Sequence, residues 1–145
     1  MTTLDALQLA LAGEHAALYV YGVLGAQTSA SDTPQLFAAV SDAYETHRAR
    51  RDHLNALVLE EGGTPVASES AYEIPGRLGS PSAVSSVALQ LERRGASTYA
   101  WLVANTVGDR RRWAIDALTD TAVRELTFRG SPEIFPGAHE FADRG

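Results

Sequence analysis

The sequence predicts an all-α protein, a single four-helix bundle of residues 1–145 with one long crossover connection between the second and third helices. Three observations predict this fold. Apolar residues recur in alternating steps of three and four in four segments, which is the period of a helix with one buried face. Capping residues, prolines and glycines mark the ends of the segments. Two connections are short, so the helices that they join are antiparallel, whereas the long one lets the third helix run parallel to the second.

The first helix is expected over residues 3–29. A threonine at position 2 or 3 can cap its free N–H groups, and Asp5 suits the positive end of the helix dipole. Its core-facing positions follow steps of three and four: Leu4, Leu7, Leu11, Glu14, Leu18, Tyr21 and Gly25. One carboxylate, Glu14, therefore lies within a stripe of leucines.

The second helix is expected over residues 33–61, from a threonine–proline start to a pair of glycines. Two phases of the helical period fit its apolar residues, and His47 faces the core in both. One phase also buries Tyr44 and Arg51, and the other buries Ala43 and Arg50. Both phases stay open at this point, and both place ionisable groups where the core should be apolar.

The crossover is expected over residues 62–80, which hold prolines and glycines but show no helical period. A connection of this length is uncommon in a compact domain unless it spans the bundle from end to end. The third helix is expected over 81–107, after a serine–proline start, and the fourth over 109–129, before a glycine. The C-terminal tail, residues 131–145, is expected to lie over the bundle.

The hairpin geometry brings ionisable residues of different helices to one height. Glu14 and His47 lie at similar distances on either side of the first turn, as Glu92 and Glu125 do on either side of the second. Together they predict a buried polar layer in the middle of the bundle. An unpaired charge there would be unfavourable by several kcal/mol, so these groups must be paired, protonated or bound to a cation.

Composition limits the function classes. Cysteine is absent, which excludes disulfides and thiolate chemistry and is typical of a cytoplasmic protein. The formal net charge is −6 and all basic residues are arginine, which argues against nucleic acid as a partner. No run approaches the ~20 apolar residues that cross a bilayer, so no membrane association is expected.

At this point the sequence resembles a known superfamily. The crossover architecture with Glu14 and Glu92 facing inward resembles the ferritin-like superfamily. In detail the chain is similar to an actinobacterial ferritin-like domain family of unknown function, through the stretches Glu14-His15-Ala16-Ala17, His47-Arg48-Ala49-Arg50-Arg51-Asp52 and Phe135-Pro136-Gly137. The resemblance covers almost the whole chain.

The resemblance also shows a departure from the superfamily's di-iron pattern. That pattern has a lone Glu on helices 1 and 3, and a Glu three residues before a His on helices 2 and 4. Here Tyr44 stands three residues before His47, and the fourth helix contains no His. A di-iron centre of the usual kind is therefore not expected, and the ancestral metal layer is interpreted as degenerate.

Three hypotheses for the polar layer follow. In the first, it is a structural network without a cofactor, in a binding or assembly module that forms a homodimer; its members are Glu14, Tyr44, His47, Arg51, Glu92, Tyr99 and Glu125. In the alternative, Glu14, His47 and Glu92 hold one Fe, Mn or Zn ion, as in a metal-binding protein or an oxidoreductase. A small anionic or polar ligand bound by the arginines is a third possibility. Whether the protein is an enzyme stays open.

Overall fold

The computed structural model describes residues 1–129, 134–136 and 138, and these contain four α-helices and no strand. The all-α bundle predicted from the sequence is confirmed. The helices are α1 (Thr3–Ala26), α2 (Pro34–Glu60), α3 (Pro81–Ala104) and α4 (Gly108–Arg129). α1 and α3 each end three residues before the predicted boundary. Most of the predicted tail, 131–145, lies outside the described residues.

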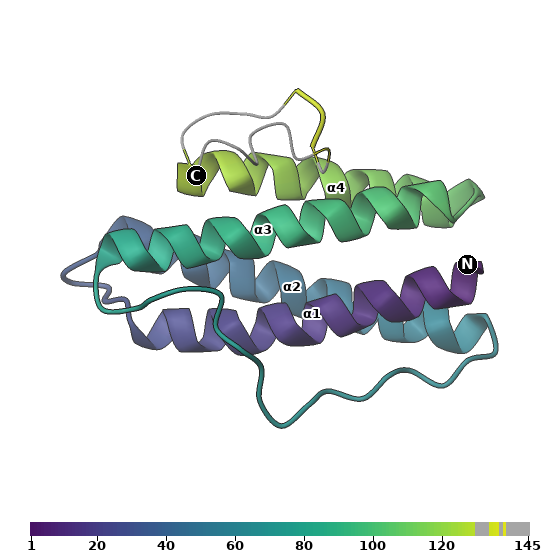
Figure 1. Ribbon diagram of the computed structural model, residues 1–145, viewed down its shortest axis with the longest axis horizontal. Coiled ribbons are helices and arrows are strands. Elements are labelled where there is room, and N and C mark those ends of the chain that lie inside the picture. Colours follow the sequence, from purple (N-terminus) through teal and green to yellow (C-terminus); the bar gives the residue numbers. More distant parts are fainter. Residues whose placement is uncertain (130–133, 137, 139–145) are drawn as a thin grey trace.

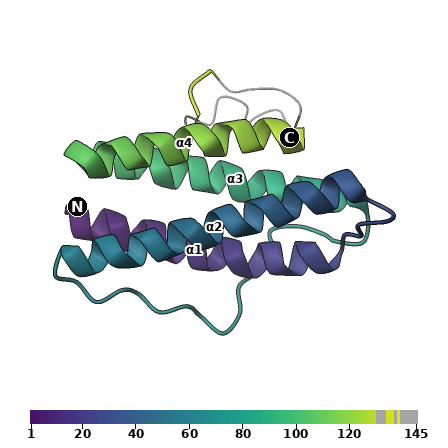
Figure 2. The same cartoon turned by 180° about the vertical axis from the view of Figure 1, so that it is seen from behind.

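The bundle consists of two antiparallel hairpins that lie one on the other (Figures 1 and 2). α1 packs against α2, α3 packs against α4, and α1 also packs against α3. The crossover leaves the end of α2, runs along the outside of α1 and enters α3 at the opposite end of the bundle (Figure 1). The third helix therefore runs parallel to the second, as the length of the connection predicts.

Local side chains fix the helix starts. At α1 the Thr2 hydroxyl accepts a hydrogen bond from the Asp5 N–H, and the Asp5 carboxylate accepts one from the Thr2 N–H, which completes a capping box. At α3 the Ser80 hydroxyl accepts from the Ala83 N–H at 3.1 Å. Thr33 differs from expectation, because its hydroxyl bonds to Ser29 in the preceding turn and caps no N–H of α2.

The crossover is attached to α1 by two polar side chains. The Gln8 amide donates to the Thr64 carbonyl at 2.6 Å and accepts from the Val66 N–H at 2.9 Å. His15 Nε2 lies 3.0 Å from the Val66 carbonyl oxygen. These bonds fix the crossover along the outer side of α1, away from the interior of the bundle.

The phase of α2 is the one that buries Arg50. Its buried residues are Val40, Ala43, His47, Arg50, Leu54, Leu57 and Val58. Tyr44 and Arg51 are each one position further along the helix and rotated by about 100° from that face. They are therefore not in the core.

The apolar core has two parts on either side of a polar layer. One cluster, near the start of α1, includes Leu7, Leu11, Leu54, Val58 and Leu102. The other, near the end of α1, includes Val20, Leu24, Val40, Val84 and Val87. Because both clusters are built from several helices, they hold the helix axes in place on both sides of the layer between them.

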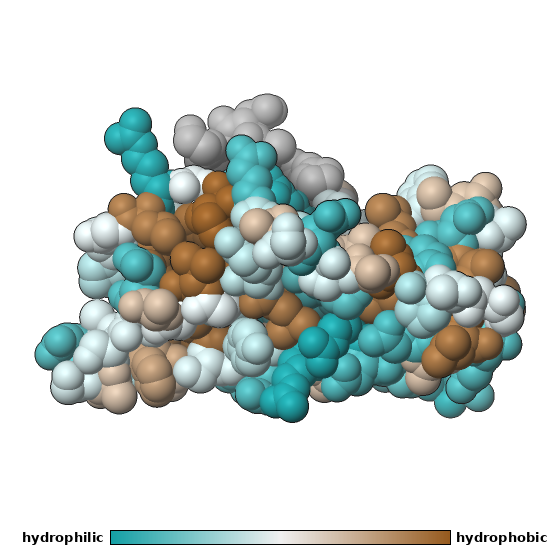
Figure 3. Space-filling model, turned by 90° about the horizontal axis from the view of Figure 1, so that it is seen from below, coloured by the Kyte–Doolittle hydropathy of each residue, from teal (hydrophilic) through white to brown (hydrophobic). Residues whose placement is uncertain are grey.

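The surface also carries apolar residues. In the face shown in Figure 3 they gather mainly in the left half of the view. By length and composition alone, α1 meets the criteria for a membrane span, contrary to the expectation that no segment approaches them. A core helix of a bundle meets the same criteria, and α1 packs against both α2 and α3.

Candidate functional site

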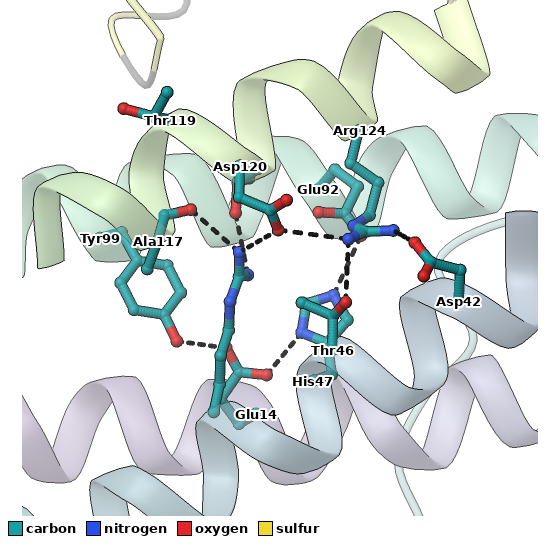
Figure 4. A network of polar contacts seen from close by, with 12 residues as sticks. Glu14, Asp42, Thr46, His47, Glu92, Tyr99, Ala117, Thr119, Asp120 and Arg124 are labelled. Atoms are coloured by element: carbon teal, nitrogen blue, oxygen red, sulfur yellow. Dashed lines mark hydrogen bonds and ion pairs between the residues drawn. The ribbon is translucent and has the colours of Figure 1, made fainter. Parts of the chain in front are cut away.

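His47 lies at the centre of the bundle between two carboxylates from different helices (Figure 4). Its Nδ1 is 2.5 Å from Glu14 Oε2 on α1, and its Nε2 is 3.0 Å from Glu92 Oε1 on α3. All three residues are at most 3% exposed. The imidazole therefore joins α2 to α1 within the first hairpin through Nδ1, and joins the first hairpin to the second through Nε2.

Two tyrosines complete this layer. The Tyr99 hydroxyl of α3 donates to Glu14 Oε1 at 2.5 Å, and the Tyr21 hydroxyl of α1 donates to Glu92 Oε1 at 2.5 Å. The Tyr21 ring also stacks on the His47 ring, with centroids 5.2 Å apart and planes at 24°. Hereafter the central layer means the five residues Glu14, Tyr21, His47, Glu92 and Tyr99.

The electrostatics of the central layer favour a charged histidine. Burial alone would lower the pKa of His47, but Glu14 and Glu92 stabilise the imidazolium and raise that pKa from 6.5 to about 9. Burial, and then the neighbouring Glu92 and Glu14 carboxylates, raise the pKa values of Tyr21 and Tyr99 well above 10. At neutral pH, His47 is therefore a cation that donates from both nitrogens, and both tyrosines are neutral donors.

Arg50 of α2 links the central layer to α4. Its guanidinium donates to the Thr121 hydroxyl at 2.9 Å, the Ala117 carbonyl at 2.9 Å and the Asp120 carboxylate at 2.8 Å. Its Cζ lies 5.0 Å from the centroid of the Tyr99 ring, within the range of a cation–π interaction. Arg50 is 6% exposed and binds α4, not the Glu14 or Glu92 carboxylate.

Arg124 makes the opposite connection, from α4 to α2. It donates to Asp42 at 2.7 Å, to the Thr46 hydroxyl at 2.9 Å and to Asp120 at 3.2 Å. Burial would lower the pKa of this guanidinium, but Asp42, Glu92 and Asp120 raise it, so it stays charged. Arg50 of α2 therefore binds residues of α4, and Arg124 of α4 binds residues of α2; the contacts of Arg124 are drawn in Figure 4.

The structure brings together four of the predicted site residues, Glu14, His47, Glu92 and Tyr99, and it buries Glu125, which is 1% exposed. Two predicted members are wrong. Tyr44 is 36% exposed, and Arg51 pairs with the neighbouring Asp52 at 2.7 Å. The reason is the phase of α2, which turns both side chains away from the core.

Sequence reasoning missed the roles of three residues. Tyr21 is one of the predicted core-facing residues of the first helix and follows Glu14 by seven residues, so the helical period could have placed it beside the polar layer. Arg50 was present in one of the two open phases. Arg124 was at the height of the layer, but its partner Asp42 is on the exposed side of α2 and no sequence pattern indicates that pairing.

The donor set does not fit the single-metal hypothesis in this arrangement. A histidine ligand needs an unprotonated nitrogen that is available to the metal, whereas each nitrogen of His47 already faces a carboxylate oxygen at 3.0 Å or less. Glu14 and Glu92 contact different nitrogens of the ring and so do not converge on one point. Among the described residues, no group of three or more His, Asp or Glu side chains has the geometry to hold a metal ion.

A small cavity between α1 and α3 reaches the central layer from the surface. Its volume is about 100 Å³, and Glu14, His47 and Tyr99 form its inner end. Small residues line its sides, namely Ala10, Gly13 and Ala17 of α1 and Gly95 of α3. The polar layer is therefore next to a space that a small molecule can enter.

Comparisons with known proteins agree with the fold. The chain is similar over its length to a conserved hypothetical protein, rv2844, from Mycobacterium tuberculosis, whose crystal structure superposes with a TM-score of 0.82. The two sequences are 30% identical, and the match covers 88% of this chain and 95% of that one. No curated protein gives a significant match. Residues 6–140 match a family that is described as a domain of unknown function (DUF4439). The chain therefore belongs to the DUF4439 family.

Proposed function

We propose that this protein is a non-catalytic, ferritin-like bundle that acts as a binding or assembly module, with a buried ion-pair network in place of an ancestral metal layer. The observation that carries the proposal is the position of His47 between Glu14 and Glu92. The imidazolium supplies one positive charge to the two buried carboxylates, and the Arg124 guanidinium interacts electrostatically with Glu92.

The ferritin-like part of the proposal has two supports. The long crossover between α2 and α3 is typical of that superfamily, and the lone carboxylates Glu14 and Glu92 lie on the first and third helices. The loss of metal binding is supported by the protonated His47 and by two cationic arginines close to the layer, which would repel a metal ion.

Metal analysis tests the proposal. The protein is purified without a His-tag, bound Fe, Mn and Zn are measured, and the melting temperature is recorded with and without each metal. We expect well below one metal ion per chain and no rise in melting temperature, because a metal ion would have to displace the His47 proton and break the bonds between His47 and the two carboxylates. About one ion per chain, lost in His47→Ala, would contradict the proposal and favour the metal-binding alternative.

The assembly that we propose is a homodimer in the cytoplasm. Three exposed apolar side chains of α4, Ile115, Val123 and Leu126, lie within one quarter of the helix circumference, which supports an association through apolar contact. Light scattering coupled to size-exclusion chromatography measures the mass directly. A mass of 15.5 kDa, that of one chain, at all concentrations would contradict the homodimer.

A further inference from the structure

The cavity between α1 and α3 is lined by one glycine from each helix, Gly13 and Gly95, and a Cβ atom added at Gly95 would point towards the Thr121 methyl group of α4, 3.7 Å away. Gly13 of α1 is exposed at its outer end, and Gly95 of α3 lies on the opposite side. A Cβ atom added at Gly13 would meet only the Thr98 methyl group, 4.0 Å away. A larger side chain at position 13 would therefore extend into the opening without a backbone clash.

The inner end of the cavity consists of buried polar groups that retain bonding capacity. Each oxygen of the Glu14 carboxylate accepts one hydrogen bond from the described residues, from Tyr99 and from His47. A carboxylate oxygen has two acceptor sites, so Glu14 is able to accept a further bond from a group inside the cavity. The described surroundings thus present an acceptor to a ligand that carries a donor.

The charges around the cavity favour an uncharged ligand. The Glu14 carboxylate is already paired with the His47 imidazolium and accepts a hydrogen bond from Tyr99, so an entering cation would have to compete with that ion pair. Arg94, which is exposed at the cavity lining, adds positive charge on the same path. An anion would lose its hydration and meet the Glu14 carboxylate. A neutral molecule neither competes with the Glu14–His47 ion pair nor is repelled by the Glu14 carboxylate.

The size and the lining limit the ligand further. A cavity of about 100 Å³ is smaller than the ~150 Å³ that holds benzene, so it accepts only a few non-hydrogen atoms. Ala10, Ala17 and Leu91 give apolar walls. We propose that the cavity between α1 and α3 is a binding site for a small uncharged molecule with a short apolar chain and one hydroxyl or amide donor, which is directed at Glu14.

The inference rests on the proposed function in one respect, since it requires an intact Glu14–His47 pair. Metal analysis examines that pair independently of any added ligand. A protein that is free of metal but does not bind the probe would contradict this inference alone, so the two failures are distinguishable.

The experiment is an amide NMR titration of the full chain with 1-propanol, and with propylammonium and propionate as probes of the same size. Gly13 and Gly95 are the reporters, because they lie on the two sides of the cavity. We expect saturable shifts of both amides with 1-propanol, and a dissociation constant in the millimolar range because so small a ligand makes few contacts. The two charged probes should bind at least about tenfold more weakly.

Matched glycine variants locate the site. Gly13→Leu fills the opening and should weaken 1-propanol binding by at least about tenfold, and Gly13→Ala, which favours the helix, should weaken it less. Gly22→Leu is the control, because Gly22 is also exposed on α1 and its added Cβ would likewise meet one side chain at 4.0 Å, that of Tyr44. It should leave binding unchanged.

Three results would overturn the inference. The first is a shift that grows linearly with 1-propanol at all amides and never saturates. The second is unchanged binding in both Gly13 variants. The third is tighter binding of propylammonium or propionate than of 1-propanol, which would assign the cavity to a charged ligand.

Discussion

Tyr21 of α1 and Tyr99 of α3 cross the same helix interface in opposite directions. Tyr99 donates to Glu14 of α1 and Tyr21 donates to Glu92 of α3, each over 2.5 Å. Each helix thus donates one tyrosine hydrogen bond to a carboxylate of the other helix. His47 lies between the two carboxylates and completes a continuous chain of five hydrogen-bonded side chains.

Removal of either tyrosine hydroxyl should destabilise the fold. Tyr21→Phe and Tyr99→Phe each take a donor from a buried carboxylate, and a bond to a charged group contributes about 1.5–3 kcal/mol to the free energy of unfolding. Tyr44→Phe is the control, since Tyr44 is 36% exposed, and should change that energy by at most ~0.5 kcal/mol. Urea denaturation at pH 7 measures all three. Equal midpoints for the three variants would contradict the network.

Substitution of Arg50 should lower the free energy of unfolding much more than substitution of the neighbouring Arg51. Arg50→Ala removes three hydrogen bonds to α4 and leaves the buried Thr121 hydroxyl without its donor, so we expect a loss of at least about 2 kcal/mol. Arg51→Ala removes a pair whose Asp52 partner is 60% exposed, and should cost ~0.5 kcal/mol or less. Denaturation midpoints in the reverse order would mean that α2 adopts the other phase.

Stability should fall in mildly alkaline solution. The pKa of His47 is 6.5 in the unfolded chain and about 9 in the folded protein, so its contribution is fully present below about pH 6.5. That contribution, of the order of 3 kcal/mol, is lost as the pH rises through about 9. Urea midpoints measured from pH 6 to 9.5 test this. His47→Gln should lose the slope and His53→Gln should keep it; a slope that survives in His47→Gln would assign it to another group.

The helical period and the end signals were sufficient to predict the four helices, the crossover and the antiparallel hairpins. They depend on local chemistry, such as the Thr2 capping box and the glycine at position 62, whose φ is +78°. The phase of α2 was not determined, because both phases bury aliphatic residues and His47. The two arginines Arg50 and Arg51 are adjacent, and only contacts with α4 decide between them.

Part of the site could also be predicted from the sequence, because the two hairpins repeat the same spacing between site residues. Tyr21 follows Glu14 by seven residues and Tyr99 follows Glu92 by seven. Glu125 also follows Glu92 at the 33-residue separation of His47 from Glu14. The repeated seven-residue spacing is therefore enough to predict that Tyr21 and Tyr99 occupy equivalent positions in their helices. The ion pair between Arg124 and Asp42 depends on how one hairpin packs against the other. The spacing of residues within a single helix does not determine that packing.

The central claim is that a protonated His47 holds Glu14 and Glu92 together, and ¹⁵N NMR of its ring nitrogens is the most direct test. We expect both nitrogens to carry a proton at pH 7, to lose one only near pH 9, and to give unchanged signals when one equivalent of Zn²⁺ is added. A neutral ring at pH 7, with one unprotonated nitrogen whose signal moves on addition of Zn²⁺, would contradict the account.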